Sequence, residues 1–240
     1  MLPIAEHPAG LARQHVDQAC VRLVRNQPPR TISPETRSPL EQITLYPYQT
    51  EAVSFLADRD GLLGDDCGLG KTVVGIEVMT KVLDLGPILI VCNKRAKEWW
   101  SASILAQYPE SRVYVAGVAG SSDMDWKQWA RLRPKAWFIT HFDGIRRTWG
   151  EMDKVLWGGV IVDEAHHIRN RKTLTAQSIK QLLSRKRLAI TASPMERSPA
   201  DLWSILNWLA PKQFTSYWRF FDRFVDYEDN YFGGRTIKGV

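Results

Sequence analysis

Short apolar runs alternate with longer amphipathic stretches from about residue 43 onward, and this alternation restricts the fold more than any other feature. Runs such as PILIVC and VIVD are apolar throughout, which is typical of strands covered by helices on both faces. The expected strands are Gly61–Gly64, Ile88–Cys92, Arg112–Val115, Trp137–Thr140, Val160–Asp163 and Leu188–Thr191. The expected helices are Tyr48–Ala57, Lys71–Leu85, Arg95–Ala106, Thr173–Ser184, Pro199–Leu209 and Phe214–Val225. The sequence therefore predicts an α/β fold with a mostly parallel sheet and helices on both faces.

The chain divides into three segments around this pattern. Residues 11–25 carry apolar residues at near-helical spacing, and residues 26–40 contain four prolines, so residues 1–42 are expected to form a helix and an extended linker. Residues 43–225 form the expected compact domain. Residues 226–240 are polar and glycine-containing, so we expect them to begin a further region and the chain to end in mid-structure.

Composition indicates an intracellular protein. With 44% hydrophobic and 24% charged residues the chain is ordinary for a globular protein, and no apolar run approaches the roughly 20 residues of a membrane helix. The N-terminus does not resemble a secretory signal, and Cys20, Cys67 and Cys92 are scattered without metal-type spacing. We expect a cytoplasmic, nucleoid or nuclear location and no membrane partner.

The charge distribution favours an anionic partner. The net charge is +6, and the segment from Ala165 to Met195 contains no Asp or Glu. The basic residues in this segment are Arg169, Arg171, Lys172, Lys180, Arg185, Lys186 and Arg187. A solvated helix face explains such a run equally well when it is considered alone.

A glycine-containing loop lies between an expected strand and an expected helix. The loop is Asp65-Asp66-Cys67-Gly68-Leu69-Gly70-Lys71-Thr72. Glycines let several backbone N–H groups point at one anion, and the helix N-terminus adds positive potential. In such a loop Lys71 reaches the β- and γ-phosphates and Thr72 binds Mg²⁺. Because Asp65 occupies the first glycine position of the strict pattern, an ordinary helix start with a flexible entry is the alternative.

Two adjacent acids end the strand VIVD about ninety residues further on. Asp163 can hold magnesium, usually through water, and Glu164 can orient the water that attacks the γ-phosphate. A surface turn after a strand is the alternative. His166 and His167 follow without further metal ligands at suitable spacing. We expect His166 to form a polar bridge to the neighbouring strand end and His167 to have no special role.

With these elements in view, the chain resembles the superfamily 2 helicases and, within them, the Snf2-like family. DDCGLGKT resembles that family's D-E-x-G-L-G-K-T, DEAH resembles its second motif, and LYPYQ resembles its Q-motif. ILIVC followed by Trp99-Trp100 resembles motif Ia, although Asn93 stands where proline is usual, and FITHF resembles motif Ib. TASP followed by DLWSILNWLAP resembles motif III and its helix, but Met195-Glu196-Arg197 replaces the usual L-Q-N. The resemblance covers residues 45–224.

The resemblance implies a RecA-like P-loop NTPase lobe that binds ATP and Mg²⁺. It implies that Gln49 selects adenine and that Lys71, Asp163 and Glu164 are catalytic. It assigns magnesium to Thr72 and Asp163, and coupling between ATP and DNA to His166, Thr191 and Ser193. The phosphates are held by Asp65, Asp66, Cys67, Gly68, Leu69, Gly70, Lys71 and Thr72.

The nucleic-acid surface is expected at the motif Ia and Ib loops, with Lys94, Arg95, Lys97 and Thr140 as contacts. Duplex DNA bound through its backbone is the expected partner, with little base specificity and a steep salt dependence. A merely solvated surface is an equally strong alternative at these lysines and arginines.

The resemblance also implies a second RecA-like lobe, in cis or in trans, that supplies arginines. Because an arginine finger contributes roughly 10³–10⁵ in rate, we expect slow hydrolysis by these 240 residues alone. Two other functions fit the same lobe: a nucleotide-binding regulatory module that does not hydrolyse ATP, and an RNA helicase or restriction-type motor subunit.

Overall fold

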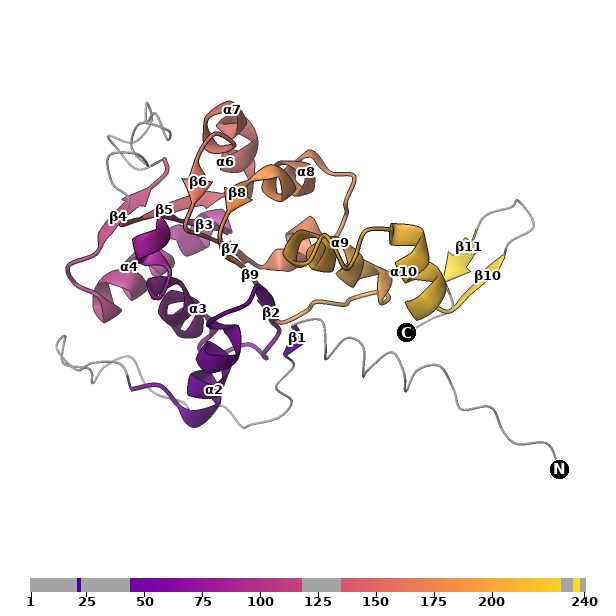
Figure 1. Cartoon of the computed structure of the whole chain (residues 1–240), viewed down its shortest axis with the longest axis horizontal. Coiled ribbons are helices and arrows are strands. Elements are labelled where there is room, and N and C mark those ends of the chain that lie inside the picture. Colours follow the sequence, from indigo (N-terminus) through magenta and orange to yellow (C-terminus); the bar gives the residue numbers. More distant parts are fainter. Residues whose placement is uncertain (1–20, 23–43, 118–134, 230–234, 238–240) are drawn as a thin grey trace.

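The computed structural model describes residues 21–22, 44–117, 135–229 and 235–237 (Figure 1). Its centre is a seven-stranded sheet in the order β1-β2-β9-β7-β3-β5-β4, and every neighbouring pair is parallel. The strands are β1 (Val21–Arg22), β2 (Gly61–Leu63), β3 (Ile88–Cys92), β4 (Arg112–Val115), β5 (Ala136–His141), β7 (Gly159–Asp163) and β9 (Arg187–Ile190). The predicted α/β class and the six predicted strands are confirmed.

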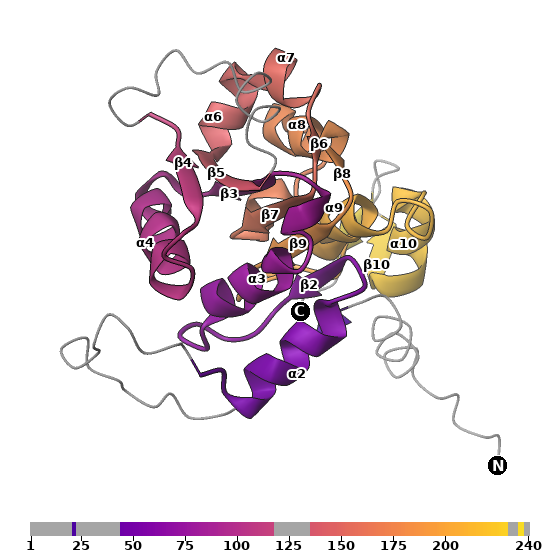
Figure 2. The same ribbon diagram turned by 60° about the vertical axis from the view of Figure 1, so that its left-hand side comes forward.

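Helices cover both faces of this sheet (Figure 2). The α-helices are α2 (Pro47–Leu56), α3 (Lys71–Thr80), α4 (Lys97–Gln107), α6 (Phe142–Arg147), α7 (Trp149–Met152), α8 (Leu174–Gln181), α9 (Ala200–Leu209) and α10 (Tyr217–Phe224). The described residues also form three short 3-10 helices, η1 (Leu83–Leu85), η2 (Lys94–Ala96) and η3 (Ala165–Ile168).

Two apolar clusters divide along the alternation of the strands. In β3, Ile88 and Ile90 pack with α2, α3 and α4, whereas Leu89 and Val91 pack with the cluster that includes α8 and α9. All five residues of β3 are buried. Burial on both faces explains why this strand is apolar throughout rather than alternating.

Several predicted boundaries were wrong. The helix expected over residues 71–85 ends at Thr80 and is followed by η1, and the helix expected over 173–184 ends at Gln181. Leu183–Ser184 instead forms β8, which pairs in parallel with β6 (Leu156–Trp157). Here a long-range backbone ladder overrides a pattern that locally favours helix.

The flanking segments are only partly described. Of the helix expected over residues 11–25, Val21 and Arg22 are described, and they form a strand paired with Leu62 and Leu63. The rest of that segment and the proline-rich linker lie outside the described residues. Near the C-terminus, β10 (Tyr227–Asp229) pairs antiparallel with β11 (Arg235–Ile237). In the described part of the chain no helix has the length and apolarity needed to cross a membrane.

Because the seven strands are parallel, their carboxyl ends meet at one edge of the sheet. The loop before α3 follows β2, the acid pair follows β7, and Thr191 follows β9. The 3-10 helix η2 and helix α6 follow β3 and β5. In open α/β sheets this edge is where ligands bind.

Candidate ATP site and nucleic-acid surface

Two glycines shape the loop between β2 and α3. Gly68 and Gly70 have φ values of +83° and +73°, a region that side chains with a Cβ rarely occupy. A Cβ on Gly68 meets nothing within 4 Å, whereas a Cβ on Gly70 lies 2.4 Å from Nε2 of Gln49. The backbone conformation therefore favours glycine at position 70, and a side chain there displaces the buried Gln49 amide from the Leu69 oxygen; Gly70 begins α3 without any side-chain cap. The N-terminus of α3 thus remains available to an anion.

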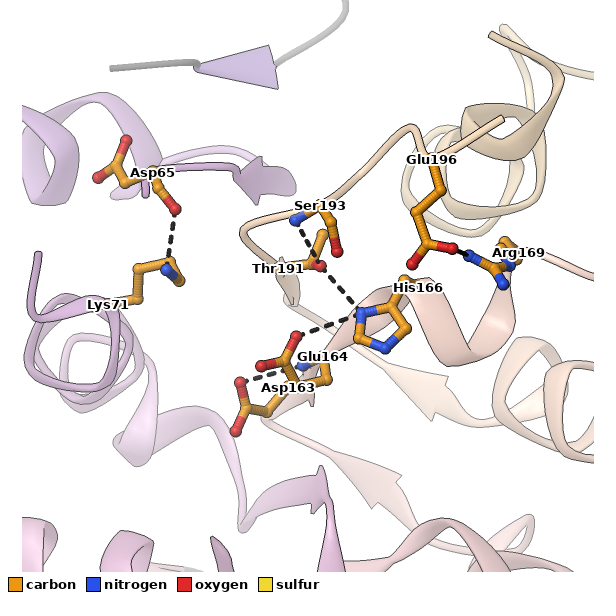
Figure 3. A network of polar contacts seen from close by, with 9 residues as sticks. All are labelled: Asp65, Lys71, Asp163, Glu164, His166, Arg169, Thr191, Ser193 and Glu196. Atoms are coloured by element: carbon orange, nitrogen blue, oxygen red, sulfur yellow. Dashed lines mark hydrogen bonds and ion pairs between the residues drawn. The ribbon is translucent and has the colours of Figure 1, made fainter. Parts of the chain in front are cut away.

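The Lys71 side chain turns back over the loop (Figure 3). Its ammonium donates to the backbone oxygen of Asp65 at 2.8 Å, as Figure 3 shows. It also donates to the backbone oxygen of Asp66 at 2.9 Å. These bonds hold the lysine side chain against its own loop. An ammonium held by neutral carbonyls can exchange them for phosphate oxygens, because charge-assisted hydrogen bonds are stronger.

Gln49 ties helix α2 to the same loop. Its Nε2 donates to the Leu69 oxygen at 3.1 Å, and its Oε1 accepts from the Tyr46 backbone N–H at 3.0 Å. The hydroxyl of Tyr48 donates to the same Leu69 oxygen at 3.3 Å. The structure thus gives Gln49 a role in holding the loop, and its predicted reading of adenine remains a prediction.

Asp163 is oriented by two hydrogen bonds at the end of β7. Its Oδ2 accepts from the indole N–H of Trp100 at 2.8 Å, and its Oδ1 accepts from the Glu164 backbone N–H at 3.0 Å. Burial raises the pKa of Asp163, while the Trp100 hydrogen bond and the Lys71 charge act in the opposite direction. Lys71 begins the helix that follows β2 and Asp163 ends β7, so the phosphate loop and the acid pair lie at the same carboxyl edge of the parallel sheet.

Glu164 has a strained backbone and leads into a polar chain. Its φ is 52°, the only positive value among the described non-glycine residues. Its Oε2 lies 3.2 Å from Nδ1 of His166, and the same nitrogen lies 3.2 Å from Oγ1 of Thr191 (Figure 3). Thr191 Oγ1 also accepts from the Ser193 backbone N–H at 3.2 Å. The predicted bridge from His166 to the neighbouring strand end is present, and its coupling role remains a prediction.

An ion pair joins the segments that follow the second and third motifs. Arg169, directly after η3, pairs with Glu196 (Figure 3). The backbone N–H groups of Glu196 and Arg197 donate to Asp201 Oδ2 at 3.2 and 2.9 Å. The unusual Met195-Glu196-Arg197 segment is thus anchored from both sides.

Two of the four residues predicted to contact DNA are buried. Lys97 is 4% exposed, and its ammonium donates to the Ala116 oxygen at 2.5 Å. Thr140 is 1% exposed. The prediction that these two side chains contact a DNA backbone was wrong, because neither is accessible. Lys94 and Arg95 are exposed at the end of β3, as that prediction requires.

A pocket of about 340 Å³ lies beside Lys94, at the ends of β3 and β5. Its lining comes from four separate segments: Asn93, His141, Phe142, Asp143, His167, Thr173 and Thr175. His167, expected to have no special role, packs against Phe142 with ring centroids 4.6 Å apart and ring planes tilted by 43°. Burial lowers the pKa of both His141 and His167, so these rings favour the neutral form.

Sequence reasoning missed the functions of several residues. Trp100 was noted only as part of a motif, yet it holds Asp163. His141 lies in the segment that resembles motif Ib but was given no role there, and no motif includes Thr173 or Thr175, yet all three line the pocket. Only the fold brings these segments together. The one signal in the sequence for the role of Trp100 was its position after an expected strand, at the edge of the sheet where the site was predicted.

The residues fit ATP and magnesium. In the described part of the chain no group of three or more His, Cys, Asp or Glu side chains is placed to hold a metal. Magnesium does not need such a group, because it is usually held by one or two carboxylates, water and substrate phosphates. Thr72 at the start of α3 and the oriented carboxylate of Asp163 match that requirement.

Comparisons with known proteins agree with this geometry. The model of the SNF2-related domain family matches residues 48–233. The ISWI chromatin-remodeling complex ATPase ISW1 of Saccharomyces cerevisiae is 29% identical over 75% of this chain and 17% of its own length. The probable ATP-dependent DNA helicase CHR12 of Arabidopsis thaliana is 31% identical over 76% of this chain and 18% of its own length.

A solved structure shares the fold of this chain. The Sulfolobus solfataricus SWI2/SNF2 ATPase core in complex with dsDNA superposes with a TM-score of 0.66 at 28% identity. The match covers 75% of this chain and 39% of that core. This chain therefore corresponds to less than half of the solved core and to about a sixth of the curated relatives.

Proposed function

Since this chain belongs to the SNF2-related domain family, we propose that it is the ATP-binding lobe of a DNA-dependent ATPase that translocates on duplex DNA. One observation carries the proposal: Lys71 and the Asp163–Glu164 pair lie at a single sheet edge, and a polar chain links Glu164 to Thr191. This arrangement combines residues that bind phosphate, acids that hold Mg²⁺ and orient water, and a polar chain that couples ATP to the segment after β9.

The proposed roles follow from the contacts. Lys71 exchanges the carbonyls of Asp65 and Asp66 for the β- and γ-phosphates, and Thr72 with Asp163 holds Mg²⁺, which neutralises phosphate charge. Glu164 orients the attacking water. When His166 moves with Glu164, Thr191 and Ser193 move with it, and this motion connects ATP to the segment after β9.

DNA is proposed as the partner on two grounds. The solved relative named above is described as a complex with dsDNA. In this chain Lys94 and Arg95 are exposed beside a pocket that ends at the same sheet edge. Relatives named as chromatin remodelers suggest that the substrate is nuclear or nucleoid DNA. A second RecA-like lobe, in cis or in trans, is proposed to supply the arginines.

The test measures Mg–ATP binding by calorimetry and ATP hydrolysis with and without duplex DNA. The wild-type chain is compared with Lys71→Ala and Glu164→Gln. We expect Lys71-dependent binding, retained binding in Glu164→Gln and very slow turnover. Failure to bind Mg–ATP contradicts the proposal. Robust DNA-stimulated turnover refutes only the need for a second lobe, and stimulation by RNA but not DNA refutes the duplex-DNA partner.

A further inference from the structure

A cluster of cations and aromatic rings lies away from the phosphate loop, where α8, α9 and α10 meet. The Arg171 guanidinium carbon is 4.4 Å from the ring centroid of Tyr217 and 5.9 Å from that of Trp203. The Lys180 ammonium is 4.8 Å from the Trp203 centroid. The two rings meet edge to face at 5.5 Å. Arg171 and Lys180 therefore share one aromatic platform, Trp203 with Tyr217.

Among the described residues, no carboxylate pairs with the positive charges on this platform. In the described part of the chain neither Arg171 nor Lys180 forms a salt bridge, and Lys180 donates only to the neutral amide of Asn207 at 2.9 Å. The nearby carboxylate of Asp201 accepts from the backbone of Glu196 and Arg197. The surrounding segment from Ala165 to Met195 contains no acid.

The positive charges of Arg171 and Lys180 also repel each other. Burial, and then the charge of Arg171, lower the pKa of Lys180 to about 8. A bound anion relieves both effects, because it compensates the lost hydration and the repulsion. A guanidinium that stacks on a ring keeps its N–H donors at its edge, where they match the oxygens of a phosphate.

We propose that Arg171 and Lys180, held on the Trp203–Tyr217 platform, form a second phosphate-binding site that grips the backbone of the nucleic acid. The inference rests on the proposed DNA-dependent function and adds a contact outside the motif Ia and Ib loops. Arg171 lies two residues before Thr173, which lines the pocket with Asn93 and His141. The site therefore extends the proposed DNA surface from β3 and β5 towards α10.

The test is the salt dependence of binding to a labelled duplex of about 30 bp, measured by fluorescence anisotropy between about 50 and 200 mM salt. We expect Arg171→Gln to weaken binding by roughly fivefold to tenfold near 0.1 M salt and to lower the salt slope by about 1, because one phosphate contact is lost. Lys180→Gln should act in the same direction. Arg185→Gln is the control, because Arg185 is exposed before the amino end of β9, at the opposite edge of the sheet.

A second measurement uses only the wild-type chain, so it does not depend on whether a substituted chain folds. Acetylation of Lys180 in the wild-type chain is followed by mass spectrometry with and without the duplex, and exposed Lys81 at the end of α3 is the reference. We expect DNA to protect Lys180 but not Lys81.

The outcomes separate the two proposals. If Lys94→Gln or Arg95→Gln weakens DNA binding while Arg171→Gln leaves the salt slope unchanged and Lys180 is unprotected, the platform only clamps the helices and this inference is wrong. A lower melting temperature with an unchanged slope leads to the same conclusion. A wild-type chain that binds no duplex overturns the proposed function as well.

Discussion

The two halves of the sheet edge differ in how well motif resemblance describes them. At the ATP half, after β2, β7 and β9, the side chains of Glu164, His166 and Thr191 make direct contacts, and Lys71 donates to the backbone of its own loop. At the other half, after β3 and β5, two of the four predicted DNA contacts are buried. A phosphate site is formed largely by backbone and by residues adjacent to glycines, so a short motif defines it. A nucleic-acid surface depends on which way each loop side chain points.

The largest expected effect tests the backbone part of this comparison. Gly70→Ala forces a Cβ into left-handed φ and displaces the buried Gln49 amide from its hydrogen bond to the Leu69 oxygen, whereas Gly68→Ala meets only the conformational cost of about 1–2 kcal/mol. We expect Gly70→Ala to weaken Mg–ATP binding by about 100-fold or more and Gly68→Ala by about tenfold. Calorimetric titration of both variants measures the difference. Equal losses contradict a steric role for Gln49.

The second prediction concerns Trp100. Trp100→Phe removes the hydrogen bond to Asp163 Oδ2 and leaves a buried carboxylate oxygen short of a donor, at a cost of about 1–3 kcal/mol. We expect chemical denaturation to show that loss, and calorimetry to show roughly tenfold weaker Mg–ATP binding. Trp99→Phe is the matched control, because Trp99 is 67% exposed. If the two variants bind Mg–ATP with equal affinity, Trp100 does not position Asp163.

These two sites show what could be predicted from the sequence. Runs buried on both faces identified six strands, and the strand–loop–helix context placed Lys71 and Asp163 at one edge. The contact from Trp100 to Asp163 spans 63 positions, and the parallel pairing of β6 with β8 joins segments separated by α8. Such contacts depend on tertiary packing, and no local pattern carries them.

The burial of Lys97, in the loop that resembles motif Ia, also depends on tertiary packing. Lys97 reads as one more basic residue in the sequence NKRAKE, yet it lies one helical turn beyond Lys94 and faces the backbone of Ala116. Helix α4 has Trp100 and Ile104 on its buried side, and Lys97 shares that side at a spacing of three and seven residues. The helical spacing could have shown its burial, but the resemblance to a DNA-contacting loop outweighed it.

The third prediction uses the difference between exposed Lys94 and Arg95 and buried Lys97. Lys94→Gln and Arg95→Gln should each weaken duplex binding severalfold and reduce the salt slope by about 1, because they remove an exposed cation. Lys97→Met should leave the slope unchanged and destabilise the fold, because the Ala116 oxygen loses its donor. Anisotropy across salt concentrations, with melting curves, distinguishes them. A reduced slope in Lys97→Met contradicts the burial of this side chain in the DNA-bound chain.

The smallest expected effect concerns the ion pair between Arg169 and Glu196. The Arg169–Glu196 pair connects the end of η3 to the segment after Thr191, and both side chains are partly exposed, which limits its contribution to stability to about 1 kcal/mol or less. A double-mutant cycle with Arg169→Gln and Glu196→Gln isolates the interaction, and Arg197→Gln is the control. If the pair serves coupling, the cycle shows a larger interaction in DNA-stimulated hydrolysis, measured with the second lobe present, than in the free energy of unfolding. An interaction seen only in unfolding assigns the pair to stability alone, and then the route from Glu164 to the nucleic acid runs solely through His166 and Thr191.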